Sequence, residues 1–240
     1  MALQYGVAMN ANASAILRSL NVALQPLVNL TSDGLIGYEA LARPAGAQTA
    51  PATLFEAALA GGWIADLELI VAARAFDSAS LASGQRLFLN VHPTALESRG
   101  FGRRLRRAVP VGRTVIEITE QGPITDAPTA LANIEELRGA GALFALDDFG
   151  SGYAHMHWLR EIRPRFIKIA QSIATDFERV PWRHSVVKNV QSFARTIGCA
   201  VIAEGIESAA TADAARELGI EFGQGYFFGR PMVMGLAKVA

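Results

Sequence analysis

Cysteine, excess charge and long apolar runs are scarce in this chain. Cys199 is the only cysteine among 240 residues, so no disulfide can form within the chain, which fits a reducing compartment. The formal net charge is zero, so bulk charge does not indicate a nucleic-acid polymer as the partner. No apolar run reaches the ~18 residues that a membrane-spanning helix needs, and the N-terminus lacks the pattern of a secretion signal. We therefore expect a cytoplasmic protein with no membrane segment in this chain.

Apolar residues are plentiful instead. They make up 51% of the chain and charged residues only 18%, so the chain can bury a large core. The length suits one large domain. We assign residues 20–240 to that domain and residues 1–19 to an N-terminal extension or the remnant of a linker. Cys199 lies at the start of an apolar segment, so we expect its thiol to be buried and unreactive.

Eight apolar segments of strand length alternate with segments of helical spacing. Near-continuous apolar runs are typical of strands that are covered on both faces of a parallel sheet. Glycines such as Gly198 and Gly219 mark the expected ends of helices. This order of elements predicts an α/β fold, a TIM-type (β/α)₈ barrel. The expected strands cover residues 22–30, 35–43, 86–92, 114–120, 143–149, 165–170, 200–206 and 221–228.

The connection between the first two expected strands is too short for a regular barrel. Only the four residues "TSDG" (31–34) join them. A crossover between parallel strands needs about a dozen residues or more, so this segment is typical of a tight turn. We therefore predict a modified barrel whose first strand runs antiparallel to the second.

A polar residue interrupts or ends the apolar run of each strand from the second onward. In a (β/α)₈ barrel the carboxyl ends of the strands meet at one mouth, where the active sites of this fold lie. We therefore expect these side chains to converge. They are Glu39, Asn90, Glu117, Asp147, Asp148, Lys168, Glu204 and Gln224.

The carboxylates in this set need partners, because an unpaired buried charge costs several kcal/mol. Lys168 alone cannot balance them, whereas divalent cations can, and oxygen ligands suit hard cations such as Mg²⁺ or Mn²⁺. Any single position could instead be a salt-bridge partner or a solvated strand edge. Because the pattern recurs at successive strand ends, it favours a metal site, in which Asp147 and Asp148 are adjacent because metal ions lie between them.

Seven short segments carry a recognisable series of motifs. They are "GYEALAR" (37–43), "LNVH" (89–92), "IEITE" (116–120), "DDFGSGY" (147–153), "FIKIA" (166–170), "AEGIES" (203–208) and "QGYFFGRP" (224–231). In this order they resemble the motifs of the EAL-domain cyclic di-GMP phosphodiesterases, over about residues 20–232. The resemblance implies a barrel with an antiparallel first strand. It also implies hydrolysis of one phosphodiester of cyclic di-GMP to linear pGpG.

The resemblance further implies a site with two divalent cations, Mg²⁺ or Mn²⁺, and inhibition by Ca²⁺. The ligands of the first ion would be Glu39, Asn90, Glu117 and Asp147. The ligands of the second would be Asp147 and Asp148. Lys168 would orient a water molecule, and Glu204 resembles the general base of the family. Paired metal ions can hold a bridging hydroxide and stabilise charge on the attacking and leaving oxygens.

Other positions would bind the substrate or support the metals. Arg43 resembles the arginine that pairs with a substrate phosphate, and a guanidinium offers a fork of donors suited to that task. Glu207 and Gln224 resemble residues that support the metals and their waters. Glu207 is therefore placed with the metal-binding set and Gln224 with the substrate-binding set.

The loop after the two aspartates and the strand that follows it carry two further features. Gly150 and Gly152 allow this loop to bend sharply, and Glu120 resembles the residue that anchors the loop in the family. Ala170 is a departure, because the family has an aspartate at the end of its K-I-D motif. Family members that lack parts of the constellation often bind cyclic di-GMP without cleaving it, or bind only proteins. An alternative function is therefore a weak or inactive domain that acts as a cyclic di-GMP receptor or protein-interaction module.

The resemblance also gives expectations for partners. Family members often dimerise through the region after the D-D-F-G loop, so we expect a homodimer. A longer parent protein could carry a fused sensory or GGDEF domain. The basic segment "RGFGRRLRRAVPVGR" (99–113) is either a solvated helix end or a surface that docks a partner or a phosphate, and the first interpretation is favoured because exposed charge runs are common.

Overall fold

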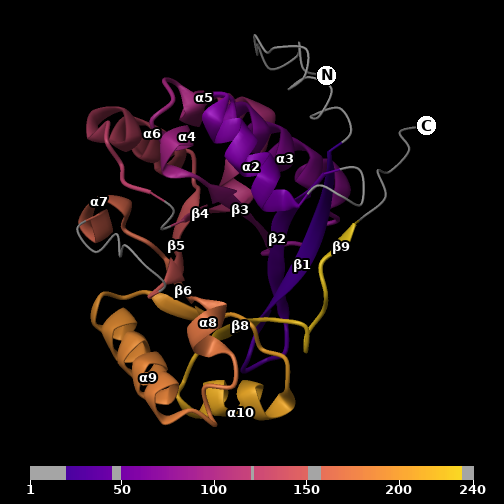
Figure 1. Cartoon of the computed structure of the whole chain (residues 1–240), viewed down its shortest axis with the longest axis vertical. Helices are drawn as coiled ribbons and strands as arrows, with labels where there is room; N and C mark the ends of the chain where they lie inside the picture. The colour runs from indigo at the N-terminus through magenta and orange to yellow at the C-terminus, as the bar shows by residue number, and fades with distance from the viewer. Residues whose placement is uncertain (1–19, 45–49, 120–121, 151–157, 234–240) are drawn as a thin grey trace.

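A closed barrel of eight strands surrounded by helices forms the protein (Figure 1). The computed structural model describes residues 20–44, 50–119, 122–150 and 158–233. The strands of the barrel are β1 (Asn21–Asn29), β2 (Leu35–Arg43), β3 (Arg86–Val91), β4 (Thr114–Ile118), β5 (Leu143–Phe149), β6 (Phe166–Ile169), β7 (Ala200–Ala203) and β8 (Phe222–Gln224). Each expected strand is present, and the predicted fold class is confirmed.

Strand order explains how the barrel closes. Strands β2 to β8 follow one another in parallel, and β1 lies between β8 and β2, antiparallel to both. In the β1–β2 pair, Asn21 lies opposite Arg43 and Gln25 lies opposite Glu39. The short turn after β1 therefore does reverse the chain, as predicted. The sequence did not predict β9 (Met232–Val233), a two-residue strand that pairs with β1 at Ala23 and Leu24.

Helices cover the barrel on opposite sides (Figure 1). On one side lie α2 (Pro51–Ala60), α3 (Ile64–Ser78), α4 (Pro93–Leu96), α5 (Phe101–Ala108) and α6 (Ala127–Gly139). The others described are α7 (Leu159–Ile162), α8 (Gln171–Ala174), α9 (Pro181–Thr196), α10 (Ala209–Glu217) and the 3₁₀ turn η2 (Val111–Arg113). Several of these helices begin with common capping residues. At the start of α10 the Ser208 hydroxyl accepts a hydrogen bond from the backbone N–H of Thr211 at 3.1 Å, and α2 and α9 each begin with proline.

The interior of the barrel is apolar at its middle and polar at one end. Side chains two residues apart on a strand point to the same face. An apolar side chain in the interior is therefore followed, two residues later, by a polar side chain nearer the C-terminal mouth. Such pairs are Phe88 and Asn90, Val115 and Glu117, Ala145 and Asp147, and Phe166 and Lys168. This alternation gives the mouth an apolar floor and a polar rim.

Cys199 is buried, as predicted. Its Sγ donates a hydrogen bond to the carbonyl of Pro164 at 2.9 Å, and burial raises the pKa of the thiol. In the described part of the chain, no helix combines the length and the apolar character needed to cross a membrane.

The basic segment 99–113 forms α5 and the turn after it. Arg104 pairs with Asp66 on α3, and Arg113 donates to the backbone carbonyls of Leu81 and Ala82. The remaining arginines of α5 are exposed, and they are Arg103, Arg106 and Arg107. Arg104 and Arg113 therefore hold neighbouring elements in place, and the others form a solvated face, on which Arg106 lies 3.8 Å from Glu136 of α6.

Candidate functional site

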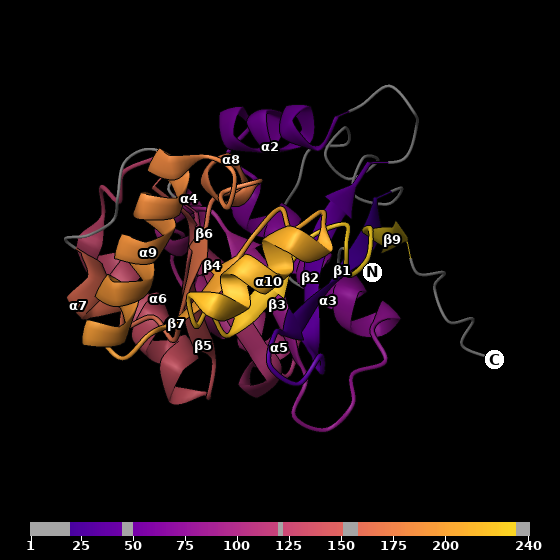
Figure 2. The ribbon, with the colours of Figure 1, turned by 90° about the horizontal axis from the view of Figure 1, so that it is seen from below.

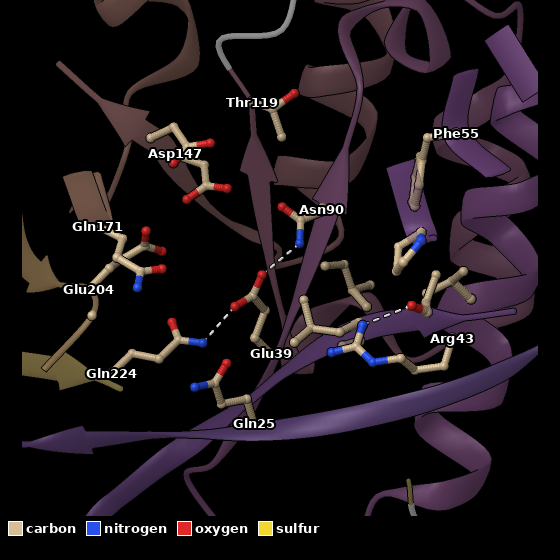
Figure 3. A pocket seen from close by; sticks show the side chains of 18 of the residues that line it. Gln25, Glu39, Arg43, Phe55, Asn90, Thr119, Asp147, Gln171, Glu204 and Gln224 are labelled. Carbon is tan, nitrogen blue, oxygen red and sulfur yellow. Dashed lines mark hydrogen bonds between the residues drawn. The ribbon is translucent and has the colours of Figure 1, made fainter. Parts of the chain in front are cut away.

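A cavity of about 380 Å³ opens at the C-terminal ends of the strands. Helices α2 and α8 lie beyond this same end of the barrel (Figure 2). The polar side chains converge on it from separate strands (Figure 3). The sequence-predicted residues that line it are Glu39, Arg43, Asn90, Asp147, Asp148, Glu204, Glu207 and Gln224. Glu117 and Lys168 are not among the lining residues and are almost completely buried.

Glu39 lies at the centre of a short hydrogen-bond chain. Its Oε1 accepts from Nδ2 of Asn90 at 2.7 Å, and its Oε2 accepts from Nε2 of Gln224 at 2.6 Å (Figure 3). Glu39 is only 7% exposed. Because both oxygens are held by amides, one from the adjacent strand β3 and one from β8 on the far side of β1, the Glu39 side chain has a fixed position at the mouth.

Lys168 places a single ammonium group among the acidic side chains. Its Nζ lies 2.7 Å from Glu204, 2.9 Å from both Glu117 and Asp147, and 3.7 Å from Glu39. Burial alone would lower the pKa of Lys168, but the surrounding carboxylates outweigh it and raise this pKa well above its ordinary value. The lysine is therefore charged, and it ties four strands together at the mouth.

One lysine does not neutralise this cluster. Burial raises the pKa of Glu117 well above its usual range and raises the pKa of Glu204 to about 8, while Lys168 opposes both shifts. Burial, together with the charge of Asp147, also raises the pKa of Asp148. These three carboxyl groups therefore give up their protons less readily than free ones do, and a divalent cation bound beside them would favour the ionised forms.

Asp148 reaches the mouth through an irregularity in β5. In a regular strand, adjacent side chains point to opposite faces. The pairing of β5 with β6 shifts register between Leu146 and Phe149, and Asp148 adopts a left-handed backbone conformation with φ of 53°. Such bulges re-aim side chains. Both Asp147 and Asp148 therefore line the cavity.

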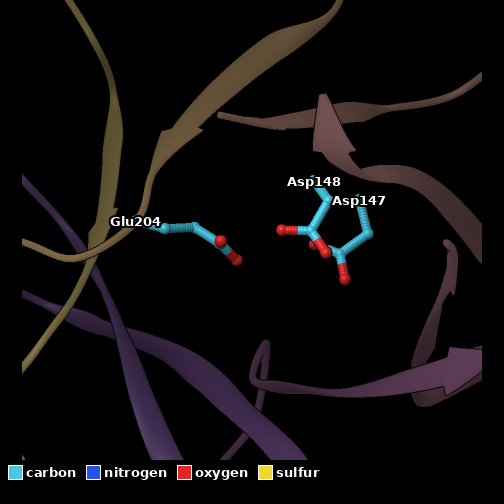
Figure 4. Close-up of side chains that lie close together, drawn as sticks. All are labelled: Asp147, Asp148 and Glu204. Atoms are coloured by element: carbon cyan, nitrogen blue, oxygen red, sulfur yellow. The ribbon is translucent and has the colours of Figure 1, made fainter. Parts of the chain in front are cut away.

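Asp147, Asp148 and Glu204 form a compact acidic cluster (Figure 4). One carboxylate oxygen from each lies within 4.8 Å of the others. Another unsatisfied group lies beside it, because Oε2 of the fully buried Glu117 has no hydrogen-bond partner among the described residues. Oxygen-only donors with an excess of negative charge suit hard divalent cations. The residues present therefore fit Mg²⁺ or Mn²⁺.

Arg43 stands apart from the acidic cluster. Its Nη1 donates to the backbone carbonyl of Ala42 at 2.9 Å, and no described carboxylate lies within ion-pair distance of the guanidinium. Glu207 is exposed at the rim. The cavity thus presents acidic groups and an arginine that no described carboxylate neutralises, which suits a ligand that carries anionic groups next to metal ions.

The predicted loop is only partly described. Gly150 has φ of 94°, and a Cβ there would lie 2.7 Å from Cδ1 of Ile173, so the turn after the aspartates requires glycine. Gly152 and Glu120 lie outside the described residues. Ala170, where the family has aspartate, is 2% exposed and does not line the cavity.

The structure adds lining residues that sequence reasoning did not select. Gln25 interrupts the apolar run of β1, which was an available signal, and it lines the cavity opposite Glu39. Glu68 lies on α3 in line with Ile64 and Val71, three or four residues apart along the helix. An acidic residue on such an apolar face was the corresponding signal for Glu68.

Glu68 is a buried acid with one open hydrogen-bonding atom. Its Oε1 accepts the backbone N–H of His92 at 2.7 Å, whereas its Oε2 has no hydrogen-bond partner among the described residues. Burial raises the pKa of Glu68 well above its usual value, and the hydrogen bond from His92 lowers it only in part. Glu68 therefore adds a further acidic side chain to the lining of the cavity.

The fold and the site define an α/β-barrel protein whose mouth carries an acidic cluster suited to divalent cations. A sequence model of the EAL domain matches residues 10–231. The chain belongs to the EAL domain family.

Known proteins support this placement. Cyclic di-GMP phosphodiesterase RocR of Pseudomonas aeruginosa is 33% identical over 159 residues, which cover 64% of this chain and 41% of RocR. The structure of Klebsiella pneumoniae BlrP1 in a manganese and cyclic di-GMP complex is 27% identical, with a TM-score of 0.74, and covers 89% of this chain and 56% of that chain. The BlrP1 structure in a calcium and cyclic di-GMP complex is also 27% identical, with a TM-score of 0.77, and the match covers 94% of this chain and 58% of that chain.

Replacing the buried lysine tests its role in holding the mouth together. We expect Lys168→Met to lower the unfolding free energy of the metal-free protein by about 3–5 kcal/mol, because buried carboxylates lose their partner. Added Mn²⁺ should restore part of this loss. Denaturant unfolding with and without the metal measures both effects. Lys188→Met, at an exposed position of α9, is the matched control and should change stability by less than about 0.5 kcal/mol. Equal stability of the two variants without metal would contradict the prediction.

Glu68 predicts a specific dependence of stability on pH. The pKa of Glu68 is raised in the folded protein. Its contribution to stability is therefore complete below the pKa of a glutamate in the unfolded chain, about 4.3, and is lost as pH rises toward the pKa of Glu68 in the folded protein. Glutamine does not ionise, so the Glu68→Gln variant does not lose this stability as pH rises. We expect the variant to gain stability over the wild type by up to about 1.4 kcal/mol per pH unit above about pH 5. Denaturant unfolding across this range measures the difference, and parallel curves for the two proteins would refute it.

Proposed function

We propose that this chain hydrolyses cyclic di-GMP to linear pGpG with the help of two divalent cations, Mg²⁺ or Mn²⁺. The observation that carries the proposal is the convergence of Asp147, Asp148 and Glu204 within 4.8 Å, in a cavity that also contains Arg43, which has no described carboxylate partner. Relatives named cyclic di-GMP phosphodiesterases support the reaction. Complexes of BlrP1 with manganese or calcium and cyclic di-GMP support the need for metal.

Different residues of the cavity would hold the metal ions, bind the substrate and accept a proton. Bound divalent cations would supply an activated water and Lewis-acid stabilisation of charge. Glu39, Asn90, Glu117, Asp147 and Asp148 would hold these ions. Arg43 binds a substrate phosphate through its forked donors. Glu204 accepts a proton from the attacking water, and Lys168 holds that carboxylate in place at 2.7 Å.

A second candidate function is a cyclic di-GMP receptor that cleaves slowly or not at all. The observation in its favour is Ala170, whose methyl group cannot hold a water molecule or the nearby lysine. Ala170 also begins α8 without a side-chain cap. The complete set of acidic residues at the mouth supports hydrolysis over reception.

The setting of this domain in the cell is also a proposal. The chain spans 27% to 41% of the length of three curated relatives that it matches, so the activity and partners of a whole protein extend beyond it. We propose a cytoplasmic location, a homodimer, and a longer parent protein with a sensory or GGDEF domain. The expected dimer region begins in residues 151–157, outside the described residues.

Turnover in different metals tests the proposed function. We expect the wild-type chain to convert cyclic di-GMP to pGpG in Mg²⁺ or Mn²⁺ and to bind it without efficient cleavage in Ca²⁺, which is larger and activates water less well. Glu39→Ala should abolish turnover, because it removes an expected metal ligand and the acceptor of two hydrogen bonds. Glu135→Ala, at an exposed position of α6, is the control and should retain wild-type turnover.

Chromatographic separation of cyclic di-GMP and pGpG measures this reaction, and calorimetry measures binding. Tight binding with no pGpG in either Mg²⁺ or Mn²⁺ would establish the receptor function instead. Absence of both binding and turnover would exclude both candidate functions.

Restoring the missing carboxylate should speed turnover. Residues that support metal ligands or their waters typically contribute about 10- to 100-fold, so we expect Ala170→Asp to raise kcat by up to this factor. Ala170→Asn has the same shape without the charge and should give little gain. Thermal unfolding of each variant controls for the cost of placing a larger side chain at this buried position. Unchanged kcat in a folded Ala170→Asp protein would show that the absent aspartate does not limit the reaction.

A further inference from the structure

An exposed aromatic side chain lies at the rim of the cavity, directly after β8. Tyr226 lines the cavity and is 48% exposed. The acidic cluster, Lys168 and Arg43 account for metal and phosphate binding, and none of those tasks requires an aromatic ring. A half-exposed aromatic ring at the entrance of the cavity is therefore suited to contact a ligand that has an apolar face.

The backbone on either side of Tyr226 is held rigidly. A Cβ on Gly225 would lie 2.1 Å from the carbonyl oxygen of Ile206, so only glycine allows these two segments to approach so closely. The N–H of Phe227 donates to that same carbonyl at 3.0 Å, and the N–H of Phe228 donates to the carbonyl of Gly225 at 3.1 Å. Tyr226 is thus presented from a fixed position, which lowers the entropy lost when a ligand packs on it.

A cation supports the ring. The guanidinium carbon of Arg230 lies 4.2 Å from the centre of the Tyr226 ring, within the range of a cation–π contact. Arg230 covers one face of the ring, and the exposed fraction of Tyr226 leaves other surface open. Its positive charge also lies near the entrance of a cavity that must admit an anionic ligand.

We propose that Tyr226, supported by Arg230, is the platform on which one nucleobase of the substrate stacks. This inference rests on the proposed function, because it assumes a nucleotide in the cavity. Every nucleobase has a flat π-face, and stacking on aromatic side chains is a general mode of nucleic-acid binding. The phosphodiester would then lie toward Arg43 and the acidic cluster, while the base lies against the rim. Tyr226 is a binding residue in this arrangement and takes no part in bond breaking.

The neighbouring residue Phe227 provides a matched control. It is exposed to a similar extent, 46%, but it does not line the cavity, and its ring packs edge-on against Phe228. If the two aromatics merely form an apolar surface patch, removal of either should have the same effect on ligand binding. If Tyr226 stacks a base, only its removal should weaken binding.

The test compares Tyr226→Ala, Tyr226→Leu, Tyr226→Phe and Phe227→Ala. We expect Tyr226→Ala to raise the Kd of cyclic di-GMP, measured by calorimetry in Ca²⁺, by about 5- to 150-fold. Tyr226→Leu, which keeps apolar bulk without a π-face, should lose most of this affinity. Tyr226→Phe and Phe227→Ala should bind within about twofold of the wild type, because both keep the ring at position 226.

A phosphodiester without a nucleobase separates stacking from damage to the site. In Mn²⁺, cleavage of methyl p-nitrophenyl phosphate should be the same in the wild type and Tyr226→Ala, whereas KM for cyclic di-GMP should rise with little change in kcat. Unchanged affinity of Tyr226→Ala for cyclic di-GMP, an equal loss in Tyr226→Phe, or an equal loss on the nucleobase-free substrate would each overturn the inference. A wild-type protein that neither binds nor cleaves cyclic di-GMP would instead overturn the proposed function on which it rests.

Discussion

The contact of one buried ammonium group with four carboxylates organises the functional end of this barrel. Lys168 reaches Glu204, Glu117, Asp147 and Glu39, which come from β2, β4 and β5 and from the segment just after β7. Because acidic groups packed so closely repel one another, the lysine is what allows them to share one small volume without metal. One ammonium group cannot balance four carboxyl groups, and an oxygen-rich cluster of this kind suits divalent cations.

The regular pleat of the strands gives the mouth its composition. Since side chains alternate along a strand, a layer of apolar residues in the middle of the barrel places a layer of polar residues above it. Strand β1 runs antiparallel to β2 and also contributes a side chain to the polar layer. That side chain is Gln25, which the register of the β1–β2 pair places opposite Glu39. The glutamine at the end of β8 then completes the ring by holding Glu39 at 2.6 Å. The strands that close the barrel therefore also bring the site residues together.

Sequence reasoning predicted the barrel because apolar runs, helical spacing and a four-residue turn are local signals. It also predicted which polar residues meet, because strand ends share one mouth. It could not show how Asp148 joins Asp147, since adjacent residues on a regular strand face opposite ways and the bulge at φ 53° arises from packing. Glu68 escaped selection because the face that α3 turns toward the mouth depends on tertiary contacts. Gln25 was within reach, because it is a polar residue in the middle of the first apolar run.

The reversed direction of β1 has a consequence for how this domain connects to other parts of a protein. In a regular barrel of this type, the chain enters at the end remote from the ligand. Here Asn21 pairs with Arg43, so β1 begins at the mouth, and β9 pairs with it there at Ala23 and Leu24. Both the entry to the barrel and its last described strand thus border the cavity rim. A segment that precedes β1 therefore joins the barrel at the end that carries the cavity and not at the opposite end.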